Sequence, residues 1–277
     1  MSRRFYFERY EIDMCERHKI DIKCTVENCI NWIKDWFDND SGKAKGIIVG
    51  ISGGKDSTVV AKLCAEAIGK ENVFGVIMPN GEQKDIKDAI RACNFIGIQY
   101  RIINIVLIYQ RMMDALNYGG MTKGEKFVIS PHTATNIPPR LRMSILYAIG
   151  QEMNYRIAGT GNLSEHTIGY FTKHGDGACD FNPIELFTMH EVLEIGDELG
   201  LPYELVHKTP SDGLCGKTDE DNFGFTYEDL DNFIRCKTSN NDEIDKKIET
   251  MEIRSFHKIM PTPVYNPDEY YMYGDNE

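Results

Sequence analysis

The chain has 277 residues, of which 42% are hydrophobic and 27% are charged, and its formal net charge is −12. This length allows one large α/β domain, and the negative charge disfavours binding to the phosphate backbone of nucleic acids. No segment approaches the roughly 18 consecutive apolar residues of a membrane span, and the N-terminus lacks a signal sequence. We therefore expect a cytoplasmic protein that binds neither membranes nor nucleic acids.

Apolar residues at helical spacing predict a first helix from about Asp21 to Phe37, with Trp32 and Trp36 beside its apolar face. Strands and helices then alternate. Strands are predicted over 46–49, 73–78 and 100–105, and helices over 58–68 and 85–96. This order is typical of an α/β fold with a doubly wound, mostly parallel sheet and helices on both faces, as in Rossmann-like proteins.

The second half of the chain continues this pattern. Residues 117–136 contain glycines and no apolar period, so we predict a mobile surface loop. A helix near Pro139 and a fourth strand over 155–158 follow, and further helices are expected to begin at Thr188, Thr226 and Asp242. We interpret residues 1–277 as one domain with a poorly ordered acidic tail from about residue 266.

A glycine- and hydroxyl-rich turn directly follows the first predicted strand and reads Gly50-Ile51-Ser52-Gly53-Gly54-Lys55-Asp56-Ser57. It leads into a helix, whose first N–H groups lack intrahelical partners and whose dipole is positive at that end. Such a turn suits a phosphate group. Asp56 inside it indicates a cation such as Mg²⁺. A strand–turn–helix junction without a ligand is the plain alternative.

The turn is not a Walker A loop, because Val49 stands where the first glycine belongs and Asp56 follows Lys55. It resembles instead the pyrophosphate loop of N-type ATP pyrophosphatases, which cleave ATP to AMP and pyrophosphate. A parallel fourth strand would bring Thr160 and Glu165 to the same edge of the sheet as Asp56.

Two further blocks narrow the resemblance: residues 136–143, and residues 159–183 with the core Phe171-Thr172-Lys173-His174-Gly175-Asp176-Gly177. Together with the turn they resemble ammonia-dependent NAD synthetases over nearly the whole chain. The resemblance implies that Mg²⁺ and ATP adenylate the carboxylate of deamido-NAD and release pyrophosphate. Ammonia then displaces AMP to give NAD. It also implies a homodimer.

The resemblance assigns roles to individual residues. Asp56 and Glu165 would bind Mg²⁺. Residues that would contact ATP are Gly50, Ile51, Ser52, Gly53, Gly54, Lys55, Asp56, Ser57, Thr160 and Ser211. Residues that would contact deamido-NAD are Arg140, Lys173, Asp180, His257 and Lys258.

Several of these residues also have plainer readings. Glu165 fits a solvated acid near a helix start, and Arg140 fits a surface ion pair. Lys173 and Asp180 fit an ordinary salt bridge, and His257 and Lys258 an exposed pair.

Two positions depart from the family. Met189 stands where the family commonly has a lysine near the ATP phosphates, and Ile77 stands where it often has an arginine near the nucleotide. A cation from elsewhere is therefore expected at the phosphates.

Alternative functions are another N-type ATP pyrophosphatase, which amidates a nucleotide or thiolates RNA, and a nucleotide-binding protein without turnover. The eight cysteines include no C-x-x-C pair, which indicates reduced thiols in the core and, with the acidic charge, disfavours RNA thiolation. Because the synthetase-like part accounts for the whole chain, we expect free ammonia, or ammonia from a separate glutaminase, as the nitrogen donor.

Overall fold

The structure, a computed structural model, describes residues 21–83, 85–118, 128–208 and 218–266. Four strands form one parallel sheet in the order β3-β2-β1-β4. They are β1 (Gly46–Gly50), β2 (Val73–Ile77), β3 (Gln99–Ile102) and β4 (Tyr155–Ala158). The predicted α/β fold with a parallel sheet is therefore confirmed.

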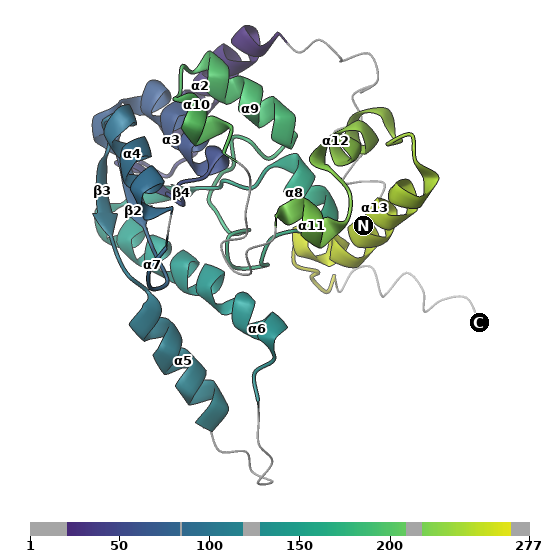
Figure 1. The fold of residues 1–277 in the computed structure, drawn as a ribbon. Coiled ribbons are helices and arrows are strands. Elements are labelled where there is room, and N and C mark those ends of the chain that lie inside the picture. Colours follow the sequence, from purple (N-terminus) through teal and green to yellow (C-terminus); the bar gives the residue numbers. More distant parts are fainter. Residues whose placement is uncertain (1–20, 84, 119–127, 209–217, 267–277) are drawn as a thin grey trace, which may run out of the picture.

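Helices precede, connect and follow these strands (Figure 1). The helices are α2 (Ile22–Asn39), α3 (Lys55–Ile68), the 3₁₀ turn η1 (Lys70–Asn72), α4 (Ile86–Ile96), α5 (Val106–Tyr118), α6 (Pro131–Thr135), α7 (Ile137–Met153), α8 (Leu163–Ile168), α9 (Met189–Glu198), α10 (Tyr203–Val206), α11 (Asp219–Phe223), α12 (Tyr227–Cys236) and α13 (Asp242–Ile259).

The sheet is covered on both faces, because successive side chains of a strand point to opposite sides. In β1, Ile47 and Val49 belong to the large cluster that contains the apolar faces of α2, α3, α4 and α9. Ile48 belongs to a second cluster, which packs against the apolar face of α7. This arrangement confirms helices on both faces and leaves the carboxyl ends of the strands open to ligands.

A third apolar cluster lies beside the sheet and is built from α8, α9, α11, α12 and α13. Its centre holds Phe223, Tyr227, Leu230 and Ile248, all at most 2% exposed. In Figure 1 these helices flank the sheet on the side of α8. One helix of this lobe of five helices, α8, carries Glu165, which lines the cleft described below.

The observed elements differ from the predicted ones at several places. Helix α3 begins at Lys55, three residues before its predicted start, so the second half of the glycine-rich turn is already helical. Residues 131–135, predicted as loop, form α6, whose Ser130 N-cap accepts a hydrogen bond from the Thr133 N–H at 3.2 Å. Helix α5 was not predicted. Helix α13 begins at Asp242, as predicted, and runs to Ile259.

The described cysteines include no disulfide, and three of them, Cys29, Cys64 and Cys93, are buried in the core, as expected for reduced thiols. Over the same described residues, no helix combines the length and the apolar character needed to cross a membrane. The predicted disorder of the tail concerns residues 267–277, which lie outside the described residues.

Candidate active site

A cleft opens at the carboxyl ends of β1, β2 and β4, with a volume of about 360 Å³. The glycine-rich turn and the segment after β4 both reach it, although about a hundred residues separate them in the chain. Lining residues that the sequence had singled out are Gly50, Ile51, Ser52, Asp56, Ser57, Thr160 and Glu165. The predicted convergence of Thr160 and Glu165 with Asp56 at one edge of the sheet is therefore confirmed.

The start of α3 leaves several backbone donors available in this cleft. Gly54 is the N-cap and has no side-chain cap. The Ser52 N–H donates to the Ser57 hydroxyl at 3.3 Å, and the Gly54 N–H donates to the Ser52 hydroxyl at 3.2 Å. Within the described residues, the N–H groups of Gly53, Lys55, Asp56 and Ser57 have no acceptor. These four groups and the positive end of the helix dipole form an anion site.

The turn depends on glycine at position 53. Gly53 has φ +86°, which L side chains rarely adopt, and a Cβ atom there would lie 2.6 Å from the carbonyl oxygen of Asp85. The turn therefore packs directly against the backbone at the start of α4. This close approach fixes where the N–H groups of the following residues point.

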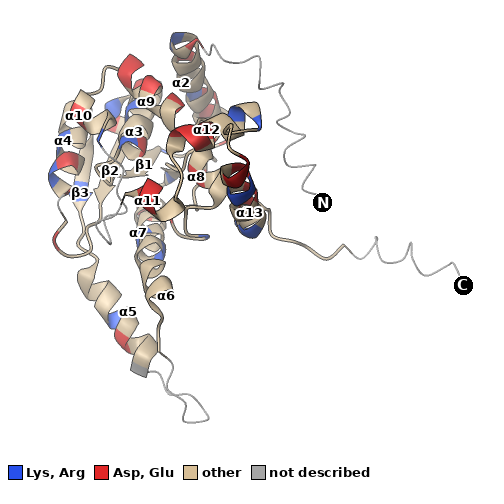
Figure 2. Cartoon of the chain, turned by 45° about the vertical axis from the view of Figure 1, so that its right-hand side comes forward, with Lys and Arg blue, Asp and Glu red and all other residues tan. Residues whose placement is uncertain are grey.

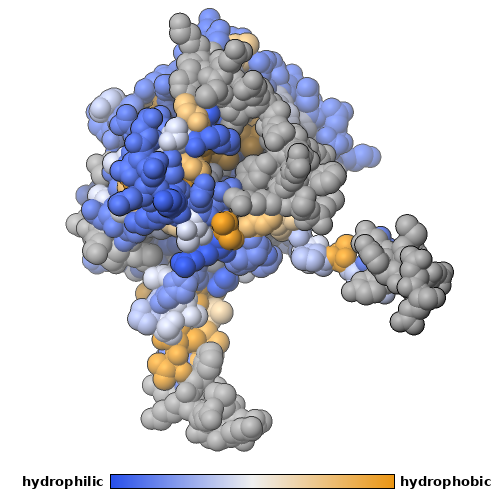
Figure 3. Space-filling view, turned by 90° about the vertical axis from the view of Figure 1, so that its right-hand side faces the viewer, coloured by the Kyte–Doolittle hydropathy of each residue, from blue (hydrophilic) through white to orange (hydrophobic). Residues whose placement is uncertain are grey.

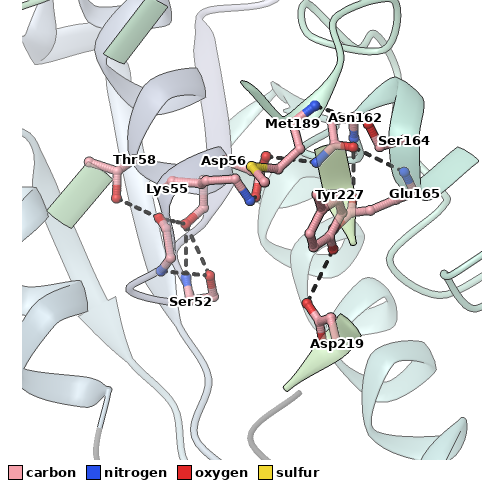
Figure 4. A network of polar contacts seen from close by, with 12 residues as sticks. Ser52, Lys55, Asp56, Thr58, Asn162, Ser164, Glu165, Met189, Asp219 and Tyr227 are labelled. Carbon is pink, nitrogen blue, oxygen red and sulfur yellow. Dashed lines mark hydrogen bonds and ion pairs between the residues drawn. The ribbon is translucent and has the colours of Figure 1, made fainter. Parts of the chain in front are cut away.

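The carboxylate of Asp56 is held from two sides (Figure 4). Its Oδ2 accepts a hydrogen bond from the Lys55 ammonium at 2.9 Å, and its Oδ1 accepts one from the Asn162 side-chain amide at 3.0 Å. Asn162 is fully buried and is the N-cap of α8. Asp56 is thus fixed in the cleft by one neighbour on its own helix and by one residue from beyond β4.

Glu165 belongs to the same network. Its carboxylate accepts a hydrogen bond from the Asn162 N–H at 3.2 Å, and the Asn162 side chain accepts one from the Glu165 N–H at 3.0 Å, which completes a capping box. Burial, and secondarily the charge of Asp56, raises the pKa of Glu165 to about 8. Glu165 is therefore a half-buried acid at the start of α8, and it lies beside a second acid.

The donor set in this cleft suits a hard divalent cation. Asp56 and Glu165 both supply carboxylate oxygens, and the charge of Asp56 contributes to the raised pKa of Glu165, so a cation between the two acids relieves their repulsion. Within the described residues, no group of three or more His, Cys, Asp or Glu side chains is arranged for a metal ion. Two carboxylates are a ligand set of the kind Mg²⁺ uses, since this ion keeps several waters and binds substrate phosphates.

A second cleft of about 290 Å³ adjoins the first, since both are lined by Gly159, Asp176 and Ala178. Lys173 and Lys258 line it, as does Cys179. The Lys258 ammonium donates to the carbonyl oxygens of Gly169 and Phe171 at 2.7 and 2.9 Å. The two lysines therefore bring positive charge to a space next to the anion site.

The other residues expected at a nucleotide lie around this second cleft. The Lys173 ammonium donates to the carbonyl oxygen of His257 at 2.5 Å, and Arg140 Nε donates to the carbonyl oxygen of Lys173 at 3.3 Å. The Asp180 carboxylate accepts from the Ile157 N–H at 2.8 Å and from the Tyr147 hydroxyl at 3.4 Å, and the described contacts of Asp180 and Lys173 include no salt bridge between them. Ser211 lies outside the described residues.

The sequence had not singled out two groups that the structure brings to the site. Arg142 lines the first cleft and donates from Nε to the carbonyl oxygen of Met78 at 2.9 Å. Asn162 joins the two acids, as described above. The capping pattern Asn162-x-x-Glu165 was a signal in the sequence that pointed to a helix start there.

The two departures from the family pattern are apolar in the structure as well. Met189 is 8% exposed and packs in the third apolar cluster together with Tyr227. Ile77 is 3% exposed and lines the first cleft. Neither position brings a charge to the anion site.

Known proteins resemble this chain over most of its length. The model of the NAD synthase family matches residues 25–264. The NH(3)-dependent NAD(+) synthetase of Carboxydothermus hydrogenoformans is 38% identical over 235 residues, which cover 84% of this chain and 93% of that protein.

Two solved structures share the fold. One is an NMN synthetase from Francisella tularensis, with a TM-score of 0.80 and 31% identity over 90% of this chain and 100% of that chain. The other is an NH3-dependent NAD synthetase from Campylobacter jejuni, with a TM-score of 0.70 and 26% identity over the same shares of the two chains.

Proposed function

The chain belongs to the NAD synthase family, and we propose that it converts deamido-NAD to NAD with ATP and ammonia. The observation that carries this proposal is the hydrogen bond from Asn162 to Asp56, at 3.0 Å. It places the Glu165 capping box and the open N–H groups of α3 around one cleft. Family membership favours this amidation over RNA thiolation, over the amidation of an unrelated nucleotide and over binding without turnover.

The first step would take place where the two clefts meet. An oxygen of the nicotinate carboxylate attacks the α-phosphorus of ATP, and the bond from that phosphorus to pyrophosphate breaks. The reactants are both anions, so the site must offset like charges. We assign the leaving pyrophosphate to Ser52–Ser57 and further ATP contacts to Gly50, Ile51, Thr160 and Ser211.

We assign the divalent ion to Asp56 and Glu165, on the fit of their oxygens described above. When bound, a magnesium ion would screen the charge of the phosphates. The protein's own part is to hold both carboxylates in place before the ion binds. Lys55 and Asn162 hold Asp56, and the capping box holds Glu165.

We assign deamido-NAD to the second cleft, with Arg140, Lys173, Asp180, His257 and Lys258 around it. Lys173 and Lys258 line that cleft and their charges suit the substrate's phosphates. In the second step ammonia attacks the activated carbonyl carbon, and AMP leaves with the bonding electrons. No protein nucleophile is required, because adenylation itself activates the carboxylate.

The direct test incubates the protein with ATP, Mg²⁺, ammonium chloride and deamido-NAD and measures NAD, AMP and pyrophosphate. We expect the three products in equal amounts and no turnover when any one reactant is omitted. Glutamine in place of ammonium is expected to give no NAD. ATP binding without products would instead support a binding protein, and pyrophosphate release only with another acceptor would support a different ATP pyrophosphatase.

A second candidate substrate is nicotinic acid mononucleotide, which the same chemistry would convert to NMN. The likeness to the NMN synthetase from Francisella tularensis favours this substrate, since the match covers the whole of that chain. The ratio of kcat/KM values for the two substrates decides between them. A ratio above about 10 for deamido-NAD, which corresponds to 1.4 kcal/mol, would support the main proposal.

We further propose that the protein is a cytoplasmic homodimer. Helix α5 carries Leu107, Ile108 and Met112 with exposed fractions of 71, 45 and 38%. Helices α5 and α6 project from the sheet as an arm with few charged residues (Figure 2), on which hydrophobic surface is visible (Figure 3). Helix α2 is less suited to this role, because Trp36 stacks on Phe181 within the protein, with ring centroids 4.3 Å apart.

A further inference from the structure

Lys55 is the least exposed of the described Lys, Arg, Asp and Glu residues, at 6%. Burying a charged ammonium is unfavourable unless it is paired. Lys55 opens the first turn of α3, where Lys and Arg are disfavoured by the positive end of the helix dipole. A buried cation at that place therefore calls for a reason other than the stability of the helix.

The surroundings of the Lys55 ammonium are anionic and aromatic. It binds Asp56 Oδ2 at 2.9 Å and lies 5.9 Å from the centre of the Tyr227 ring. The Tyr227 hydroxyl donates to Asp219 at 3.2 Å. Burial lowers the pKa of Lys55, but the charges of Asp56, Glu165 and Asp219 together outweigh burial, so its pKa is raised.

A divalent ion changes the charge balance of this cluster. Asp56 and Glu165 together carry two negative charges when ionised, and Lys55 offsets one of them. An ion with two positive charges on the same carboxylates would lie beside the ammonium and repel it. The nearest new anion would then be the polyphosphate at the N–H groups of α3, the helix to which Lys55 itself belongs.

We propose that the Lys55 side chain is a catalytic cation of the amidation reaction, which leaves Asp56 for a phosphate oxygen when the divalent ion and ATP bind. This proposal rests on the proposed function. As the bond from the α-phosphorus to pyrophosphate breaks, its electron pair passes to the pyrophosphate, and the ammonium stabilises the growing charge by a hydrogen bond. Lys55 keeps its proton throughout.

Met189 shows that this space admits a side chain from the opposite side. Its N–H donates to the Ser164 hydroxyl at 3.0 Å, which places the start of α9 next to α8 and Glu165. Met189 shares the third apolar cluster with Tyr227, and Figure 4 shows its side chain running toward Lys55 and Asp56. A lysine at position 189 would therefore bring an ammonium to the same place from α9.

The kinetic test compares Lys55→Met with the unchanged protein in the NAD assay. Loss of one such electrostatic contact lowers kcat by about 100-fold, and we expect this loss with an unchanged KM for deamido-NAD. The kcat of the double variant Lys55→Met/Met189→Lys is expected to be at least about tenfold higher than that of Lys55→Met. If Lys55 had only a structural role, a lysine at position 189 would not restore kcat. The matched control is Lys62→Met, on the same helix, where Lys62 pairs with Glu66 at the surface; we expect it to keep its activity within about twofold.

A crystal structure of the unchanged protein with Mg²⁺ and α,β-methylene-ATP tests the proposal without a variant and without turnover. The expected result is a Lys55 Nζ within about 3 Å of a phosphate oxygen. A Nζ that remains on Asp56 and binds no phosphate oxygen overturns the proposal, whether or not Lys55→Met folds.

The kinetic outcomes separate the two levels of inference. An active unchanged protein together with an equally active, folded Lys55→Met overturns the role of Lys55 alone. An unchanged protein that makes no NAD overturns the proposed function and the role of Lys55 with it.

Discussion

Asp56 illustrates how single residues carry the chemistry of this chain. The side chain stands at the second position of α3 and is held by donors from the adjacent Lys55 and from the distant Asn162. A group fixed in this way needs little rearrangement to receive a cation, which is what electrostatic catalysis requires. The proposed metal site therefore depends on an acid whose position is set before any ligand arrives.

Asp56→Asn should remove the charge and retain the shape of the side chain. We expect NAD formation to fall by at least about 100-fold, because the divalent ion loses one carboxylate ligand. The fold should persist, as judged by circular dichroism. Asp35→Asn, at an exposed position on α2, is the control and should keep full activity. Full activity of Asp56→Asn would exclude the carboxylate from the metal site.

His190 on α9 contacts Asp231 on α12, which also binds Ser164 on α8. This contact makes the free energy of unfolding depend on pH. Its Nδ1 lies 2.7 Å from Asp231, whose other carboxylate oxygen accepts from the Ser164 hydroxyl at 2.5 Å. The hydrogen bond to Asp231 raises the pKa of His190 despite some burial, and Glu228 and Glu194 act in the same direction. Because the pKa is raised in the folded state, the His190–Asp231 contact stabilises the fold fully at pH values below the ordinary pKa of histidine. This stabilisation is lost as the pH rises through the raised value.

His190→Gln should therefore lower the unfolding temperature more at pH 5.5 than at pH 8.5. The loss is about 1 kcal/mol or less, since the His190 side chain is 49% exposed and solvent screens the pair. Thermal unfolding at the two pH values measures it, with His132→Gln on the exposed surface of α6 as control. An equal loss at both pH values would contradict this account.

Among the elements, the glycine-rich turn and the start of α4 are in close backbone contact. Gly53→Ala combines an unfavourable φ of +86° with a Cβ contact of 2.6 Å to backbone. We expect it to cost about 1–3 kcal/mol of stability and to weaken ATP binding, because the N–H groups after it shift. Chemical denaturation and ATP titration measure the two effects.

Gly200→Ala is the matched control for this prediction. Gly200 has φ +66°, and a Cβ atom there would have no neighbour within 4 Å. Backbone strain alone should lower the free energy of unfolding of this variant by about 1–2 kcal/mol, and ATP binding should stay unchanged. If Gly53→Ala proves no more harmful than Gly200→Ala, the close contact with α4 does not shape the turn.

Elements with strong local signals were predictable from the sequence. The Thr188 and Thr226 capping boxes begin α9 and α12 where they were expected. The short helix α8 was missed, because six residues offer too little apolar period to detect.

The convergence of Thr160 and Glu165 on Asp56 followed from the parallel topology alone. The hydrogen bonds of Lys55 and Asn162 did not, since they depend on side-chain directions that local patterns leave open.

For the molecule as a whole, the proposed homodimer gives α5 a partner. Leu107→Lys places a charge on its most exposed apolar position and should yield a monomer in light scattering, because a charge at an interface core is costly. Tyr203→Lys, at a residue that is 69% exposed on α10, is the control and should leave the dimer intact. A monomeric unchanged protein, or a dimeric Leu107→Lys, would contradict the proposed interface.

The hydrogen bond between Asn162 and Asp56 exists only if β4 lies beside β1 in one particular alignment, with Val49 opposite Ala158. A shift of β4 by one residue would move Asn162 by about 3.3 Å and turn the side chains of the strand to the other face. The acids would then no longer meet. The proposed binding of magnesium and ATP would therefore report correct strand pairing, and a refolding chain should acquire it only after the carboxyl ends of β1 and β4 have paired.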